Sequence, residues 1–176
     1  MKNVIALGLA SGLLSLAAGP AIAQGPAMPQ PTSEHALLAQ DVGEWTATVK
    51  MWMGPGDPVE STGTETVSMR GPFWQVADFK GNVMGQDFEG TGWTGWDAEK
   101  KQYVGVWIDS MTPGIAHGTA TWDPAAKTFN GSMESMGPDG RMQTMETSVS
   151  YPNEGTRVFT MKTDDQTTME ITYTRK

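Results

Sequence analysis

The chain has 176 residues, a formal net charge of −8 from 20 acidic and 12 basic side chains, and no cysteine. The lack of cysteine excludes disulfide bonds, thiol chemistry and cysteine-ligated metal sites. The acidic balance argues against nucleic acid or an anionic membrane as the partner, and its simplest consequence is solubility. The length is sufficient for one domain with a core of its own.

The N-terminus has the pattern of a secretory signal peptide. Lys2 supplies the positive charge, residues 4–18 are apolar and small, and Ala21-Ile22-Ala23 fits a cleavage site before Gln24. A transmembrane helix is the alternative, but the apolar stretch is shorter than the ~20 residues that a span needs. Residues 1–23 therefore predict a periplasmic or secreted protein without stable insertion into a membrane.

A short lead-in separates this segment from the main domain. Residues 24–32 contain three prolines and no charged side chain, which predicts a disordered linker. Residues 33–41 predict a short helix with Ser33 as its N-cap and an apolar face that includes Leu37 and Leu38. In a barrel formed by residues 33–176, such a helix would cover one end.

Alternating apolar and polar residues follow from Gly43 to the C-terminus, with a turn signal about every ten to twelve residues. The predicted strands are residues 44–53, 60–70, 73–80, 86–96, 102–109, 115–122, 127–136, 141–150, 156–163 and 168–175. Their connections are short and rich in Gly, Pro, Asn and Asp, so consecutive strands should pair. The pattern predicts an all-β fold: an antiparallel up-and-down β-barrel of about ten strands with a short N-terminal helix.

The period of two assigns an inner face to the first and last strands. Trp45, Ala47, Val49 and Met51 share the apolar face of the first strand. Met169, Ile171, Tyr173 and Arg175 share that of the last strand. If these strands pair to close the barrel, the Arg175 guanidinium can lie across the Trp45 indole.

Gly43-Glu44-Trp45 on the first strand and Arg175 on the last resemble the signature of the lipocalin and fatty-acid-binding superfamily. That resemblance implies a lipocalin-like barrel that holds a ligand, with the Trp–Arg pair at one end. The central block Gly92-Trp93-Thr94-Gly95-Trp96-Asp97, followed by residues 103–111, resembles the bacterial family of unknown function DUF1579. The second resemblance covers most of residues 38–175 and implies no reaction.

Aromatic and thioether side chains are the candidate ligand contacts. The chain has seven tryptophans and 13 methionines, which favour an aromatic-walled cavity with adaptable methionine lining. The candidate wall positions are Trp74, Trp93, Tyr103, Trp107 and His117. The expected ligand is a small hydrophobic or amphipathic molecule. The alternatives are packing of these rings in a filled barrel that acts as an interaction module and, for a Met51–Met53 pair, Cu(I) binding.

Catalytic and metal signals are weak. The two histidines are far apart, and neither a Glu-x-x-His motif nor a Gly-x-Ser-x-Gly motif is present. Asp109 and Ser110 follow an apolar run, where they fit a strand-ending turn better than a catalytic group. An enzyme that uses Asp109 and His117 remains an alternative, and the sequence predicts no catalytic residue, no metal site and no cofactor.

Overall fold

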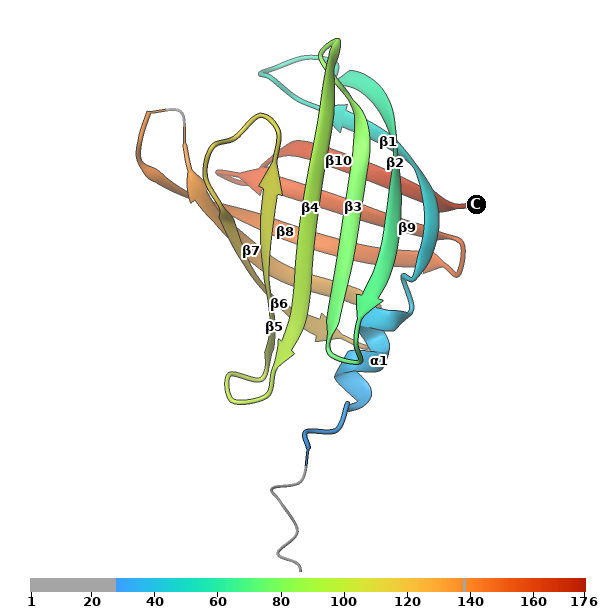
Figure 1. The fold of residues 1–176 in the computed structure, drawn as a ribbon. Coiled ribbons are helices and arrows are strands. Elements are labelled where there is room, and N and C mark those ends of the chain that lie inside the picture. The colour runs from blue at the N-terminus through green and yellow to red at the C-terminus, as the bar shows by residue number, and fades with distance from the viewer. Residues whose placement is uncertain (1–27, 138) are drawn as a thin grey trace, which may run out of the picture. The chain divides into compact units, whose positions relative to one another are not determined.

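The computed structural model describes residues 28–137 and 139–176, and the barrel occupies residues 31–176 (Figure 1). The predicted signal peptide at 1–23 and residues 24–27 of the predicted linker lie outside the described residues. The elements are α1 (Ser33–Ala39), β1 (Gly43–Met51), β2 (Val59–Arg70), β3 (Trp74–Val83), β4 (Gln86–Asp97), β5 (Gln102–Asp109), β6 (Ala116–Asp123), β7 (Thr128–Met136), β8 (Met142–Asn153), β9 (Thr156–Thr163) and β10 (Gln166–Arg175). The ten predicted strands are all confirmed, with ends that shift by a few residues.

The strands form one closed antiparallel barrel in sequence order, and β1 pairs with β10 to close it. Every consecutive pair is hydrogen-bonded, as short turns require. The predicted all-β, up-and-down, ten-stranded barrel is therefore confirmed. Full closure leaves no unpaired strand edge, which removes the usual site for association by strand addition.

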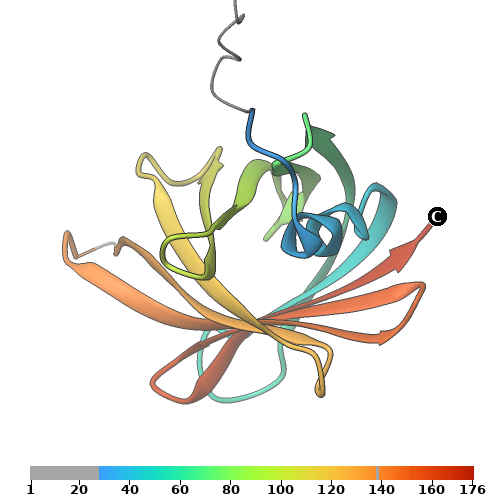
Figure 2. The same cartoon turned by 90° about the horizontal axis from the view of Figure 1, so that it is seen from below.

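Because the strands alternate in direction, their connections alternate between the two ends of the barrel. We call the end that carries the β1–β2, β3–β4, β5–β6, β7–β8 and β9–β10 connections the mouth end. The other end carries α1 and the remaining connections, and we call it the helix end. Figure 2 shows α1 lying across the helix end.

Helix α1 is held by its own cap and by hydrogen bonds from two strands. Thr32, rather than the predicted Ser33, is the N-cap, and its backbone N–H donates to His35 Nδ1 at 2.9 Å. The Nε2 of Gln75 on β3 donates to the Leu38 carbonyl at 2.7 Å. The Tyr103 hydroxyl on β5 donates to the Glu34 carbonyl at 3.2 Å. The first of these bonds caps the start of the helix, and the other two attach α1 to β3 and β5.

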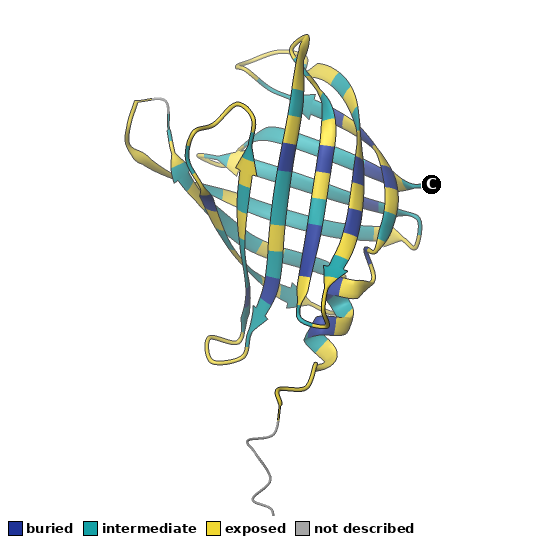
Figure 3. Ribbon diagram, viewed as in Figure 1, coloured by how far each residue is buried: buried dark blue, intermediate teal, exposed yellow. Residues whose placement is uncertain are grey.

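Burial is uneven around the barrel (Figure 3). The buried apolar cluster lies on the inner faces of β1, β2, β3 and β10 and consists of Trp45, Ala47, Val49, Val67, Phe79 and Tyr173. Inner residues of β7 to β9, such as Met133, Met145 and Phe159, are only half-buried. The core therefore fills one side of the interior and leaves space along the other.

Candidate functional site

A cavity of about 530 Å³ occupies the barrel interior. It reaches from the mouth end, where Met111 and Thr112 border it, to Arg157 and Tyr173 near the helix end. The inner faces of most strands contribute to its wall, and the lining is predominantly apolar. This volume is within the range of small-molecule sites, roughly 300–1,000 Å³.

Large rings line the cavity along β3, β4 and β5, and inward glycines make room for them. Phe79, Phe88, Tyr103 and Trp107 belong to this wall. The Trp107 ring lies over Gly90 and Gly92, where a Cβ at Gly92 would come within 3.1 Å of the ring. The glycines therefore permit a tryptophan to lie flat against the wall instead of filling the centre of the barrel.

Methionines line the opposite part of the wall. Met51, Met169 and Met161 face one another in register on β1, β10 and β9. Met133 and Met145 form a directly opposed pair on β7 and β8. All five side chains border the cavity. Because methionine is unbranched and polarisable, this half of the wall can adapt to ligands of different shape.

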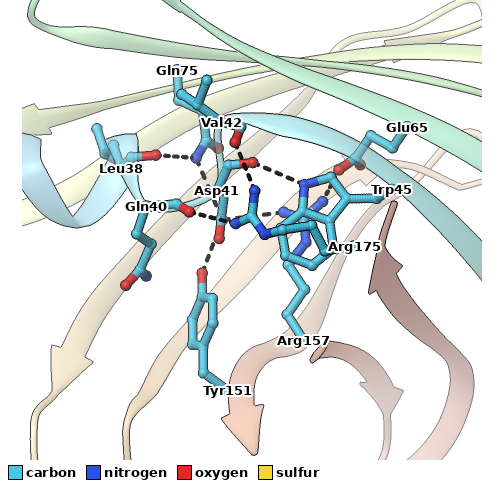
Figure 4. Close-up of polar contacts among 10 residues, drawn as sticks. All are labelled: Leu38, Gln40, Asp41, Val42, Trp45, Glu65, Gln75, Tyr151, Arg157 and Arg175. Atoms are coloured by element: carbon cyan, nitrogen blue, oxygen red, sulfur yellow. Dashed lines mark hydrogen bonds and ion pairs between the residues drawn. The ribbon is translucent and has the colours of Figure 1, made fainter. Parts of the chain in front are cut away.

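A buried ionic cluster, drawn in Figure 4, adjoins the cavity near the helix end, and its members Glu65 and Arg157 line the cavity. Arg157, which is 6% exposed, donates from Nη1 to Asp41 Oδ2 at 3.1 Å and forms an ion pair through Nη2 with Glu65. Its guanidinium carbon lies 4.7 Å from the ring centroid of Trp45 and 4.3 Å from that of Tyr173. Two carboxylates and two aromatic rings thus contact the Arg157 guanidinium. These contacts fix its position in the interior near the helix end.

Burial controls the protonation of this cluster. It raises the pKa of the Asp41 carboxyl, although Arg157 and a hydrogen bond from Tyr151 at 2.9 Å act in the opposite direction. Burial also raises the pKa of Tyr173 to about 12, and that of Tyr103 to about 12. Desolvation disfavours the charged form of each group, so both tyrosines are neutral at physiological pH.

The predicted closure by Trp45 and Arg175 is present at the helix end (Figure 4). The Arg175 guanidinium carbon is 4.2 Å from the indole centroid, and its nitrogens donate to the carbonyls of Val42 and Gln40 at 2.8 and 2.7 Å. Gly43 has a φ of +141°, and a Cβ there would lie 2.8 Å from Arg175 Nη1. The glycine of the Gly-x-Trp sequence therefore gives the arginine access to the carbonyls before it.

Two of the five predicted wall residues border the cavity, and three do not. Tyr103 and Trp107 lie on the inner face of β5. Trp74, Trp93 and His117 point outward, which corrects their predicted placement. On β4 the inward positions beside Trp93 are Gly92 and Thr94, so the alternation places the larger residue outside.

Each outward residue has a partner on the outer surface. Trp74 packs over Gly95, its partner in the β3–β4 ladder. The Arg70 guanidinium carbon lies 5.8 Å from the Trp93 ring. His117 is exposed and stands opposite Glu134 on β7. These positions are those of surface packing and not of a ligand pocket.

The alternative of an enzyme that uses Asp109 and His117 finds no support in the geometry. Asp109 is on the inner face of β5, where it accepts a hydrogen bond from Trp107 Nε1 at 3.1 Å. Its other oxygen accepts from the backbone N–H groups of Met111 and Thr112, so it forms a strand-ending turn. His117 lies on the outer face of the neighbouring strand. The barrel wall therefore separates the two side chains.

Sequence reasoning missed the ionic cluster of Asp41, Glu65, Gln75 and Arg157. One signal was available: Arg157 alternates with Phe159 and Met161, so the period of two places it on the inner face. Among the described residues, no group of three or more His, Cys, Asp or Glu side chains is arranged to hold a metal ion. The described helix is not long and apolar enough to cross a membrane.

Comparison with known proteins places this barrel among related folds. A family model described as a protein of unknown function, DUF1579, matches residues 30–175. Rv2717c from M. tuberculosis is similar in structure, with 10% identity, coverage of 84% of this chain and 99% of that chain, and a TM-score of 0.62. The S-type phycobiliprotein lyase CPES from Guillardia theta has 11% identity, coverage of 82% and 93%, and a TM-score of 0.56. No curated protein sequence matches the chain. At such identities the structural matches show a shared fold, which agrees with the predicted lipocalin-like barrel.

Proposed function

The chain belongs to the DUF1579 family. We propose that it is an exported carrier that binds one small hydrophobic or amphipathic molecule non-covalently. The observation that carries the proposal is the cavity of about 530 Å³ inside a closed barrel. A barrel filled by its own side chains, which would act as an interaction module, would leave less than roughly 300 Å³.

The wall chemistry supports the class of cargo. Thioethers on one side and aromatic rings on the other offer an apolar surface with few hydrogen-bonding groups. The carboxylates of Asp41 and Glu65 already partner Arg157. A ligand would therefore gain most of its binding free energy from apolar contact, at about 25 cal/mol per Å² of buried surface.

Export is the second part of the proposal. The signal-peptide pattern of residues 1–23 supports it, since it predicts a mature chain that begins at Gln24. The mass of the protein from the periplasm or the medium tests this directly. A chain that retains Met1–Ala23 and stays in the cytoplasm would contradict export and leave the binding proposal intact.

Native mass spectrometry of the protein purified from its own cells tests the carrier function. We expect a native mass that exceeds the denatured mass by a defined small increment. A bare protein is then titrated with N-phenyl-1-naphthylamine, a neutral apolar fluorophore. Absence of both a bound molecule and saturable fluorophore binding would overturn the proposal.

A pair of variants on β6 localises the binding. A Cβ added at the inward Gly118 meets no atom closer than 3.8 Å, so Gly118→Leu should extend into the cavity and weaken fluorophore binding about tenfold or more. His117→Leu, at an exposed outer position of the same strand that does not line the cavity, is the matched control and should bind normally. Equal binding by the two variants would place the fluorophore outside the barrel.

A further inference from the structure

The mouth end carries a set of exposed apolar side chains that the fold does not use. Four of its five connections have such residues in them or beside them. The exposed fractions are 69% for Met53, 62% for Met84, 43% for Met111, 54% for Ile115, 51% for Met136 and 61% for Met142. We call these six residues the apolar rim. Because these exposed apolar side chains gather at one end of the molecule, they are available for contact with a partner.

Met84 shows that local folding does not account for the rim. It has a φ of +55° and precedes Gly85, with a φ of +84°, in the two-residue turn between β3 and β4. Asn is the favoured residue at the first position of such a turn, because it adopts a positive φ more readily than other residues with a side chain. The methionine side chain is 62% exposed, so it gains no burial in this turn and is available for contact with a partner.

The β7–β8 hairpin presents a second part of the rim. Met136 and Met142 are directly opposed at the tip of the ladder, on the outer face of the barrel. Their side chains form one apolar surface across two strands. Met111 and Ile115 flank the neighbouring β5–β6 connection. The rim thus follows the loops around the opening instead of covering one flat side.

The charges at this end indicate which surface can meet the rim. The five mouth-end connections contain four acidic residues, Asp57, Asp139, Asp164 and Asp165, and one basic residue, Arg141. An anionic lipid surface would be repelled. A zwitterionic lipid surface has no net charge and would not repel these acidic loops. Flexible apolar side chains can enter such a surface even though the protein and the lipid are not complementary in shape.

We propose that the apolar rim docks the barrel, mouth first, on the surface of a zwitterionic lipid bilayer. The six side chains enter the interface between headgroups and acyl chains, while the barrel stays outside the hydrocarbon. The cavity, which Met111 borders, then opens toward the acyl chains. This contact goes beyond the carrier function and does not depend on it, because the empty protein carries the same rim.

Sedimentation of the purified full chain with phosphatidylcholine vesicles tests the proposal. The triple variant Met53→Gln, Met84→Asn and Met142→Gln should lower the partition coefficient about tenfold or more, because three apolar anchors are lost. The matched control, Val42→Thr with Val106→Thr, removes exposed apolar side chains away from the mouth and should bind like the wild type. Replacing about 30 mol% of the lipid with phosphatidylglycerol should weaken binding at low salt, and added salt should restore it.

The outcomes separate this proposal from the others. Met84→Asn alone should keep or raise the melting temperature while it weakens vesicle binding, so unfolding cannot mimic the result. Wild-type protein that ignores vesicles, or a triple variant that binds them equally, overturns membrane docking. If the wild-type protein does not bind vesicles and is a dimer, whereas the triple variant is a monomer, the rim is an interface between copies of the chain. Fluorophore binding by each variant reports on the carrier function independently.

Discussion

Trp45 and Arg175 are direct partners in the β1–β10 ladder, and the guanidinium carbon lies 4.2 Å from the centroid of the indole ring. One nitrogen of Arg175 bonds the Val42 carbonyl and another bonds the Gln40 carbonyl. The last residue of the last strand is thereby attached to the segment that joins α1 to β1. This pair closes the helix end of the barrel without touching the cavity.

Replacing Arg175 with Ala should therefore lower stability much more than ligand binding. The loss of one cation–π contact and two charge-assisted hydrogen bonds should reduce the free energy of unfolding by about 2–4 kcal/mol. Urea denaturation measures this change, and fluorophore titration in the same buffer measures binding. Arg175→Lys is the matched control and should be intermediate, because it keeps the charge but cannot bond both carbonyls. Equal melting temperatures for Arg175→Ala and wild type would refute the closure role.

Arg157→Met should be more damaging than Arg175→Ala. It leaves the carboxylates of Asp41 and Glu65 buried without their cation, for which we expect a loss of about 3–5 kcal/mol. Adding Asp41→Asn and Glu65→Gln to this variant should recover most of the loss, because the buried charges are then gone. Thermal unfolding of the single and triple variants measures the recovery. A triple variant that is less stable than Arg157→Met would contradict this account of the cluster.

Gly90→Ala should disturb the aromatic wall, whereas Gly118→Ala should not. A Cβ at Gly90 clashes with the Trp107 ring, but one at Gly118 has no neighbour closer than 3.8 Å. We expect Gly90→Ala to cost about 1–3 kcal/mol and to change the tryptophan fluorescence, because the ring must move toward the cavity. Both glycines lie within strands, so Gly118→Ala controls for the general effect of the substitution. The same cost for both would show that Trp107 does not depend on the glycine.

Stability should fall at alkaline pH through Tyr173. Its folded pKa is raised from 10.0 to about 12, so between these values the native state keeps a proton that the unfolded state has lost. The free energy of unfolding then decreases as pH rises, and for this one group the decrease from pH 8 to pH 11 is about 1 kcal/mol. Urea denaturation at both values measures it. Tyr173→Phe, which is equally apolar but cannot ionise, should lack this part of the decrease, and an unchanged pH dependence would contradict the assignment.

Strands and turns were predictable because two simple signals coincide in this sequence. The first and last strands alternate strictly, as in Trp45, Ala47 and Val49, and Gly, Pro and Asp occur in the intervals between strands. Together these signals also determined which strands pair, since short turns leave few other topologies. The closing contact of Trp45 with Arg175 followed from the same alternation.

The faces of the central strands could not be predicted in the same way. On β4 the inward positions include Gly90 and Gly92, so a large residue such as Trp93 looks like the inner one although it lies outside. Size and hydrophobicity fail as guides where the wall uses glycine to accommodate a ring from the next strand. Which face of β4 points inward depends on the contact of its glycines with Trp107 on β5. The sequence of β4 alone does not reveal this contact.

The closure of the barrel also determines when the chain can fold. The bonds from Arg175 to Val42 and Gln40 span 133 and 135 residues, and the bond between Arg157 and Asp41 spans 116. Contacts between such distant parts of a chain form slowly. A chain that ends before β10 has no partner for the outer edges of β1 and β9, which leaves them free to pair with other chains. Folding must therefore await release of nearly the whole polypeptide, and a late truncation should produce aggregation in place of a smaller barrel.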